Sequence, residues 1–443
     1  MNPEFLRNVW LEMTTRRVLL MVGLLGLTFA AAALANGDWG PASVATWLYY
    51  IIVVILGSRS AALSVVGEIG ARTWDSQRLS SLGAGEMMWG KLFGATIYNW
   101  FGGAICLAVL LTHEAITAGA GTAALDLLYY VGIGVISQAA ALLASLIAIG
   151  RGQGHSRLEV FAYQLVGLVA GVAVWWVWDE VKSHTVDTIV WWGHPLDAAI
   201  FLLASLVIFS VWTLVACFRE MRLELKMRNG PLVWLAFLVF IGFYVAGFDA
   251  WLSQELKSWD PGALRLLLAG TAYGILTYIM VLLEPKDRVH YRWMQGQIRQ
   301  GHVANALNGT QAWMMGYAAT FLAGIVLFFW LLHDVSAALV GQPLVLAALG
   351  FLTRDVSLFV LMQTLPGRRR GDFGALAILF ALYVLIPWIL ASLNANALMF
   401  LFFPQLPSPT FVGAIAAWVQ GIAVAGLTLT RLALTEKGQP VPA

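Results

Sequence analysis

Residues 134–150 read GVISQAAALLASLIAIG and contain no charged side chain. With the mostly apolar residues from position 125 onward, they are long enough to cross a bilayer core, which takes about 20 helical residues. A segment in lipid must satisfy its own backbone hydrogen bonds, and an α-helix does so. This stretch therefore predicts a transmembrane helix.

The composition of the whole chain agrees with that interpretation. Of its 443 residues, 60% are hydrophobic and only 11% are charged, and the mean hydropathy is +0.78. Soluble domains carry about 25% charged residues, so this composition excludes a soluble protein. The sequence predicts an all-α polytopic membrane protein surrounded by lipids. The net charge of only +2 gives no reason to expect a nucleic-acid partner.

Twelve apolar runs are long enough to span the membrane. They lie near residues 18–36, 44–66, 92–112, 125–150, 159–178, 198–218, 231–250, 263–284, 312–332, 343–365, 373–391 and 411–430.

Lysine and arginine indicate the orientation of these spans. If both termini lie in the cytoplasm, 21 of the 26 basic residues fall in cytoplasmic segments, as the positive-inside rule requires. One span more or fewer would invert every later loop and remove this asymmetry. We therefore expect a multi-pass protein of a cell membrane of the bacterial inner-membrane type, with both termini cytoplasmic.

The chain also contains an internal repeat. At an offset of 216 residues, 134–150 aligns with 350–366, and Glu68 and Arg72 align with Glu284 and Arg288. We expect two parallel six-helix halves, residues 1–218 and 219–443, related by an axis along the membrane normal.

Each half begins with an amphipathic segment. In PEFLRNVWLEMTTRR the apolar residues recur at helical spacing, which predicts an interfacial helix over 3–17. FREMRLELKMRNG predicts a similar helix at about 219–229.

The stretch GEMMWGKLFG at 85–94 has the Gly-x-x-x-x-Gly-Lys spacing of a phosphate-binding P-loop. A true P-loop follows a buried strand and continues with Ser or Thr, whereas Leu92 follows Lys91 here. The bulky residues Met87, Met88 and Trp89 would also keep the backbone away from a phosphate. We therefore do not expect this chain to bind ATP.

The longer stretch GEIGARTWDSQRLSSLGAGEMMWGKLFG at 67–94 resembles the membrane domain of type-2 ABC exporters. The likeness covers most of residues 1–218. It rests on an acidic residue at the end of span two, a basic-Thr-acidic cluster, Leu-Ser and a late Gly-Lys. The resemblance implies a coupling helix at about 68–84 that docks a separate ATPase subunit. The ATPase-coupling residues that it implies here are Glu68, Arg72, Thr73, Asp75 and Arg78.

The second half departs from this pattern. Its segment EPKDRVHYRWMQGQIRQG at 284–301 retains Glu284 and Arg288 and adds Arg292, but it lacks the Thr-acidic pair and Gly-Lys. We expect a coupling segment there that makes a second, non-identical ATPase contact. Two outer segments, FFPQLPSPTF and WWGHPLDA, resemble the re-entrant segments of such permeases.

The resemblance places ATP and Mg²⁺ on two partner ATPase subunits, as a homodimer or a heterodimer, and leaves this chain without a cofactor. Accessory subunits, the cargo and the direction of transport stay open. No arrangement of residues predicts a catalytic or metal site. Arg59, Arg354 and Asp355 lie inside predicted spans, where charges are costly, so they are candidates for a translocation path or for structural ion pairs.

Two other function classes stay open. Twelve spans in two parallel halves also describe a secondary transporter of the major-facilitator type. Against it, the loop between spans two and three lacks that family's Gly-x-x-x-Asp-Arg signature, and no long loop divides the halves. A polytopic membrane transferase would need a carboxylate or histidine cluster, which the sequence does not indicate.

Overall fold

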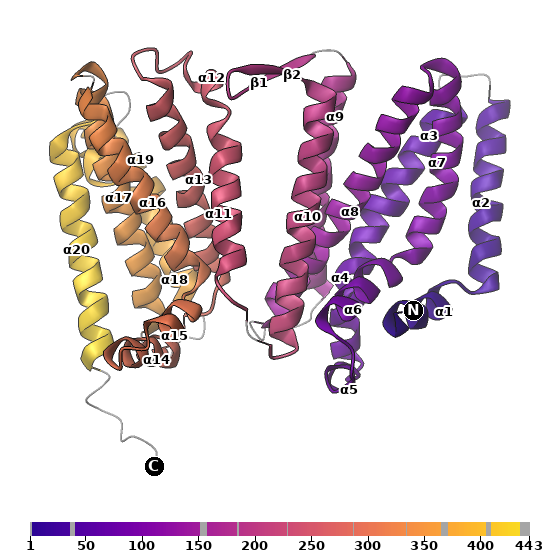
Figure 1. Cartoon of the computed structure of the whole chain (residues 1–443), viewed down its shortest axis with the longest axis horizontal. Coiled ribbons are helices and arrows are strands. Elements are labelled where there is room, and N and C mark those ends of the chain that lie inside the picture. The colour runs from indigo at the N-terminus through magenta and orange to yellow at the C-terminus, as the bar shows by residue number, and fades with distance from the viewer. Residues whose placement is uncertain are drawn as a thin grey trace. The chain divides into compact units, whose positions relative to one another are not determined.

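The computed structural model describes residues 2–35, 40–150, 157–183, 186–227, 229–286, 288–333, 335–364, 371–404 and 409–434 (Figure 1). Six basic residues that supported the predicted orientation lie outside these ranges: Arg151, Arg228, Arg368, Arg369, Arg370 and Lys437.

The chain folds as two compact units. The first comprises Met1–Ile189 and Leu196–Asn229, and the second comprises Val190–Pro195 and Gly230–Ala443. The helices of the first unit are α1 (Pro3–Glu12), α2 (Thr15–Leu34), α3 (Pro41–Tyr49), α4 (Gly57–Gly70), α5 (Trp74–Arg78), α6 (Ala84–Trp89), α7 (Ile97–Thr117), α8 (Ala120–Gly150), α9 (Arg157–Lys182) and α10 (Ala198–Glu224), with π-helical turns η1 (Tyr50–Leu56) and η2 (Gly90–Gly94).

The second unit is helical as well. Its elements are α11 (Leu232–Ala246), α12 (Asp249–Leu252), α13 (Pro261–Leu283), α14 (Arg288–Arg299), α15 (Val303–Asn308), α16 (Ala312–Trp330), α17 (Val335–Thr364), α18 (Gly371–Phe380), α19 (Ile386–Ser392) and α20 (Phe411–Leu434). Three short helical segments complete it: the 3-10 helices η3 (Leu331–His333) and η5 (Asn396–Leu401) and the π-helical turn η4 (Ala381–Leu385).

Eleven helices among the described residues are long and apolar enough to cross a membrane, and they coincide with eleven of the twelve predicted spans. The predicted span over 231–250 differs, because α11 has only 15 residues and ends before Gly247. At about 1.5 Å per residue it is shorter than a bilayer core of about 30 Å. Trp192 donates its backbone N–H to the Gly247 carbonyl, and a Cβ on Gly247 would lie 2.2 Å from the Trp191 indole nitrogen. These tryptophans therefore occupy the place where α11 would continue.

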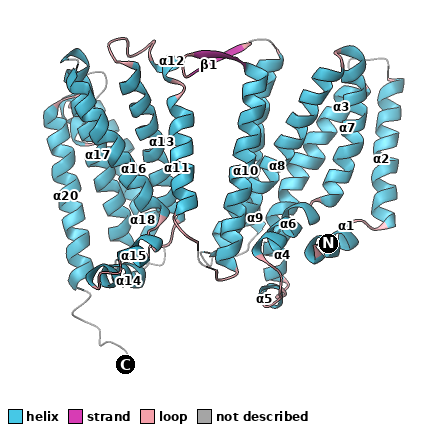
Figure 2. Ribbon diagram, viewed as in Figure 1, coloured by secondary structure: helices cyan, strands magenta, loops and turns pink. Residues whose placement is uncertain are grey.

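The two strands were not expected in an all-α protein (Figure 2). β1 (Thr188–Trp191) and β2 (His194–Asp197) form a two-stranded sheet. The turn between them has positive φ at Trp192 (52°) and Gly193 (74°), the geometry of a tight hairpin. WWGHPLDA is therefore a hairpin turn and second strand rather than a re-entrant segment.

Two predicted boundaries are wrong. The first amphipathic helix, α1, ends at Glu12 rather than at 17, because the chain turns at Met13 before α2 begins. Residues 219–224 do not start a separate interfacial helix; they form the last turns of α10, which Arg78 secures by pairing with Glu224. The division between the units accordingly falls after Asn229.

The helix boundaries within the two predicted coupling segments also differ from those expected. Residues 68–84 do not form one helix, because α4 ends at Gly70 and only the five residues of α5 are helical before α6. In the second unit α13 ends at Leu283 and α14 follows as a separate helix.

Each unit is built around one long, well-buried helix. In the first unit α8 packs against α4, α9 and α10, and in the second α17 packs against α16, α18 and α20 (Figure 1). Helix α8 contains the segment 134–150, and α17 contains residues 350–364 of the segment that aligns with it.

Candidate functional site

Helix α1 rests on two glycines of η2. A Cβ on Gly90 would lie 2.5 Å from Cγ of Glu4, and a Cβ on Gly94 would lie 2.9 Å from Cβ of Asn8. Only a residue without a side chain allows this approach. Asn8 also donates a 3.3 Å hydrogen bond to the Gly90 carbonyl. The Gly-Lys sequence that matches the P-loop spacing is therefore part of the surface on which α1 packs.

Four charged side chains hold α1 against this surface through ion pairs. We call these residues, Glu4, Arg7, Glu68 and Lys91, the charge quartet. Lys91 Nζ lies 2.7 Å from Glu4 Oε1 and also pairs with Glu68. Arg7 Nη2 lies 2.8 Å from Glu4 Oε1 and likewise pairs with Glu68. The side chains of Lys91 and Glu4 are only 1% and 4% exposed. Each carboxylate pairs with both cations, so removing Lys91 or Glu4 would unbalance the charge of a mostly buried network.

Asn2 begins α1 and ties it to a neighbouring helix. Its side-chain oxygen accepts hydrogen bonds from the backbone N–H groups of Glu4 and Phe5, as an N-cap should. Its amide donates to the Glu86 carbonyl in α6 at 2.7 Å. The start of α1 is therefore fixed to the segment by which the chain enters the third span.

Helix α5 is anchored on one side and exposed on the other. Trp74 is 4% exposed, and Lys91 Nζ lies 5.7 Å from the centre of its ring. Arg78 donates from Nε and Nη2 to the backbone and carboxylate of Glu224, at 2.9 and 3.0 Å. The side chain of Asp75 is 90% exposed, and Leu79 is 89% exposed.

The predicted coupling residues of the first half therefore fall into two groups. Glu68 and Arg78 face inward and hold α5 and its surroundings in place. Arg72, Thr73 and Asp75 are exposed.

Arg72 has an unusual backbone conformation. Its φ is 58°, and it follows α4 in a motif in which Thr73 N–H donates to the Glu68 carbonyl and Arg72 N–H to that of Ile69. This helix ending normally has glycine at the position of Arg72. A side chain in the left-handed region costs about 1 kcal/mol.

Glu284 occupies the end of α13. Its carboxylate accepts hydrogen bonds from the N–H groups of Ala312 and Trp313 in the first turn of α16, at 2.9 and 3.1 Å. Burial raises the pKa of Glu284, and the two N–H donors oppose that rise. Lys286, whose side chain is 1% exposed, pairs with Asp372 in α18 at 2.9 Å. Glu284 and Lys286 thus join the ends of three helices rather than facing outward.

The other two predicted residues of this segment lie on α14. Arg292 is partly buried there, and the side chain of Arg288 lies outside the described residues.

Arg354 and Asp355 form a buried ion pair in α17. Arg354 Nε donates to Asp355 Oδ1 at 2.8 Å, and the residues are 3% and 0% exposed. Asp355 Oδ2 accepts further bonds from Tyr278 of α13 and Tyr383 of η4, at 2.8 and 2.6 Å. Arg354 Nη1 donates to Gln420 of α20 at 2.9 Å. We call these five residues the ion-pair cluster. Arg59 joins neither cluster and lies on the exposed side of α4.

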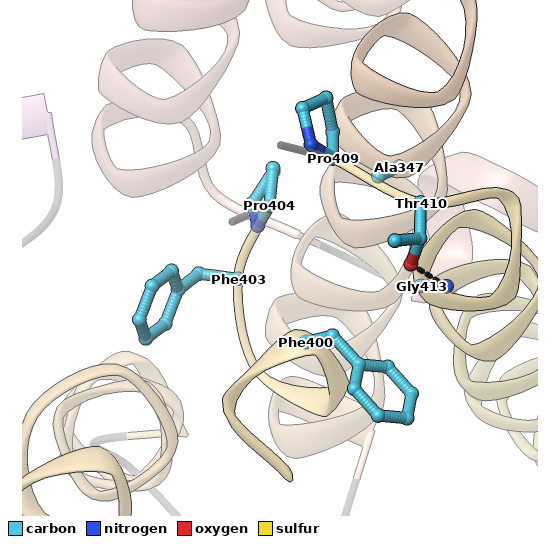
Figure 3. A pocket seen from close by; sticks show the side chains of 7 residues that line it. All are labelled: Ala347, Phe400, Phe403, Pro404, Pro409, Thr410 and Gly413. Atoms are coloured by element: carbon cyan, nitrogen blue, oxygen red, sulfur yellow. Dashed lines mark hydrogen bonds between the residues drawn. The ribbon is translucent and has the colours of Figure 1, made fainter. Parts of the chain in front are cut away.

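A small cavity lies beside α17, where the segment after η5 packs on Ala347 (Figure 3). Its volume of about 10 Å³ suits one water molecule. Thr410 Oγ1 accepts a hydrogen bond from the Gly413 N–H and so caps the start of α20. Residues 405–408 of the predicted re-entrant segment lie outside the described residues. The other residues lining the cavity are Phe400, Phe403, Pro404 and Pro409.

Several residues of these sites were not predicted. A Gly-x-x-x-Gly pattern at 90–94 was present in the sequence and could have indicated close helix packing. The polar side chains Glu4 and Asn8 of the amphipathic helix α1 were a weaker signal for a buried partner. The missed residues are Asn2, Glu4, Arg7, Asn8, Gly94, Glu224, Tyr278, Tyr383 and Gln420.

No protein-family model matches this chain, and no curated protein or solved structure matches it either.

Proposed function

We propose that this chain is the membrane subunit of an ATP-driven exporter of the type-2 ABC class. Separate ATPase subunits would dock on the exposed side of α5 in the first unit and on α14 in the second, at the cytoplasmic face of a cell membrane. ATP and Mg²⁺ would bind to those partners, so the chain itself would hydrolyse nothing.

The charge quartet carries this proposal. It joins α1, the end of α4 and the start of the third span into one rigid body directly beside α5. A force on α5 would pass to this body through Trp74 and to α10 through Arg78. Packed helices move as rigid bodies between discrete arrangements, which makes α5 a suitable lever for switching the bundle.

The strained backbone at Arg72 supports docking as well. The exposed Arg72 occupies a position that favours glycine, which costs stability, and such strain is typical of functional positions. Arg72, Thr73, Asp75 and Leu79 together give the partner both charges and an apolar contact.

The second unit suggests a different contact. Glu284 aligns with Glu68 in the sequence, but the two carboxylates have different partners. Glu284 accepts hydrogen bonds from the N-terminus of α16, whereas Glu68 pairs with Lys91 and Arg7. This difference supports two non-identical docking sites, with the longer, arginine-bearing α14 replacing the short α5.

The experiment is affinity purification of the tagged chain from its native membrane, followed by mass spectrometry and an ATPase assay. We expect a P-loop ATPase to co-purify with the wild type and to be lost from Asp75→Arg and Leu79→Asp. Lys226→Glu, an exposed charge reversal just after α10, is the matched control and should retain it. Recovery of no ATPase with the wild type, or of equal amounts with Asp75→Arg and Leu79→Asp, would contradict the proposal.

The ion-pair cluster favours a second candidate, an ion-coupled secondary transporter. Ionisable groups within membrane helices often belong to ion or proton pathways. Reconstituted vesicles containing only this chain distinguish the two functions. A flux driven by a proton or sodium gradient without any ATPase would establish the second candidate and exclude the first.

A further inference from the structure

The guanidinium group of Arg354 is incompletely bonded. Nε donates to Asp355 and Nη1 to Gln420, but Nη2 is buried and has no hydrogen-bond partner among the described residues. A buried donor without an acceptor costs about 1–3 kcal/mol. Of the three nitrogens, Nη2 is therefore the one whose donors are wholly unused.

Aromatic rings restrict how that molecule could approach. The guanidinium carbon lies 4.7 Å from the centre of the Phe351 ring and 5.0 Å from that of Tyr383. The cation therefore lies over both rings, which occupy space on those sides of it. A ligand would therefore reach Nη2 near the guanidinium plane, in the geometry that carboxylates and phosphates adopt with arginine.

The carboxylate of Asp355 does not compete for this position. Its two oxygens already accept three hydrogen bonds, from Arg354, Tyr278 and Tyr383. Oδ1 accepts from Arg354 Nε, whereas Oδ2 accepts from the two tyrosine hydroxyls. The N–H groups of Nη2 therefore stay available for another acceptor.

The surroundings favour a ligand with an apolar body. Val281, Leu352, Val356 and Phe359 form a buried apolar cluster against which Tyr278 and Tyr383 pack. A small hydrated ion would lose its water there without compensation. An amphiphile would instead keep its tail in hydrocarbon while its head reaches Arg354.

The cluster also lies close to exposed apolar residues of the second unit. Next to Tyr383, Val384 is 47% exposed, and Ile422 is 63% exposed two residues after Gln420. Tyr383 belongs to the π-helical turn η4, and such turns are frequent at functional sites. Pro387 has no N–H for the Tyr383 carbonyl, which explains why the helix is irregular here.

We propose that Arg354 binds the carboxylate or phosphate group of an amphipathic anion within the second unit. The proposal that an anion binds here does not depend on the transport function. The proposal that this anion is the cargo rests on the transport function proposed above.

The test measures binding of radiolabelled laurate to the purified chain in phosphatidylcholine nanodiscs, without any ATPase. We expect saturable binding of one laurate per chain, competition by dodecyl phosphate, and no competition by dodecanol or inorganic phosphate. Asp355→Asn removes the neighbouring negative charge and should tighten binding at least about tenfold. The double variant Arg354→Met/Asp355→Leu should lose saturable binding while remaining folded, because both charges leave together.

A second ion pair of the same unit gives the control. Arg265 Nη2 lies 3.0 Å from Asp249 Oδ2, and Arg265→Met/Asp249→Leu should bind laurate like the wild type. Equal binding by the Arg354→Met/Asp355→Leu variant, or no saturable binding by both the wild type and Asp355→Asn, would overturn the proposal. Effective competition by inorganic phosphate would show a soluble anion as the ligand and overturn it as well. Because no ATPase is present, these outcomes are independent of ATPase docking.

Discussion

The ammonium group of Lys91 lies 2.7 Å from the carboxylate of Glu4, although two membrane-spanning segments separate the residues in the sequence. Both side chains are almost fully buried, so water and salt screen their attraction little. The contact exists only while α1 rests on Gly90 and Gly94. Helix α1 is therefore a structural part of the first unit as well as an amphipathic segment.

Replacing Lys91 with methionine should destabilise the protein strongly. Glu4 and Glu68 would lose their buried partner, and breaking such an arrangement costs about 3–5 kcal/mol. The free energy of unfolding in mixed micelles measures the effect. Arg16→Met, at an exposed position, should change it by less than about 0.5 kcal/mol. Equal effects of the two variants would refute the structural role of the quartet.

The packing of α1 on the glycines of η2 can be tested separately from the ion pairs of the charge quartet. Gly90→Ala would place a methyl group against Glu4 and the backbone of Phe5. We expect amide hydrogens of residues 3–12 to exchange at least about tenfold faster, since α1 would detach locally. Gly26→Ala adds the same methyl group where no atom lies within 4 Å, and it should leave exchange unchanged.

Glu284 should make stability depend on pH. Burial raises the pKa of its carboxyl in the folded state above the value of 4.5, so the folded state binds the proton more tightly than the unfolded chain. Its contribution to stability is therefore greatest at acidic pH and falls as the pH rises above 4.5. Glu284→Gln retains an acceptor oxygen but cannot ionise.

We therefore expect the unfolding free energy of Glu284→Gln to rise relative to wild type between pH 4 and pH 7. Parallel pH profiles of the two proteins would be inconsistent with this assignment.

Arg72 and Lys226 offer a matched pair for separating strain from function. Both have a left-handed backbone, with φ of 58° and 61°, directly after a helix. Replacing either with glycine should raise the unfolding free energy by about 1 kcal/mol. Arg72→Gly alone should weaken ATPase co-purification. Loss of the ATPase from Lys226→Gly as well would show that strain relief, rather than the arginine side chain, is responsible.

Hydropathy predicted most of the fold, because a membrane span is a local property of about 20 consecutive residues. It failed at α11, where the length of the helix depends on Trp191 and Trp192 from a distant hairpin. The end of α10 was also mistaken, since the charged residues 219–224 stay helical through the contact of Glu224 with Arg78.

The candidate sites were predicted less completely. The sequence singled out Glu68 and Lys91 as unusual, but it could not show that they pair with each other and with α1. Such contacts join segments that are far apart in the chain, so no local pattern records them. Likewise, the side chains of Arg354 and Asp355 were recognisable as costly, whereas Tyr278 and Tyr383 look like ordinary apolar-helix residues.

The balance of charge in the quartet has an electrical consequence. Two carboxylates offset one ammonium and one guanidinium, so moving the four together transfers no net charge. A membrane potential acts on net charge, at about 2.3 kcal/mol per elementary charge for each 100 mV. The rigid body that includes α1 should therefore shift between conformations with little sensitivity to voltage, and its displacement should give no gating current.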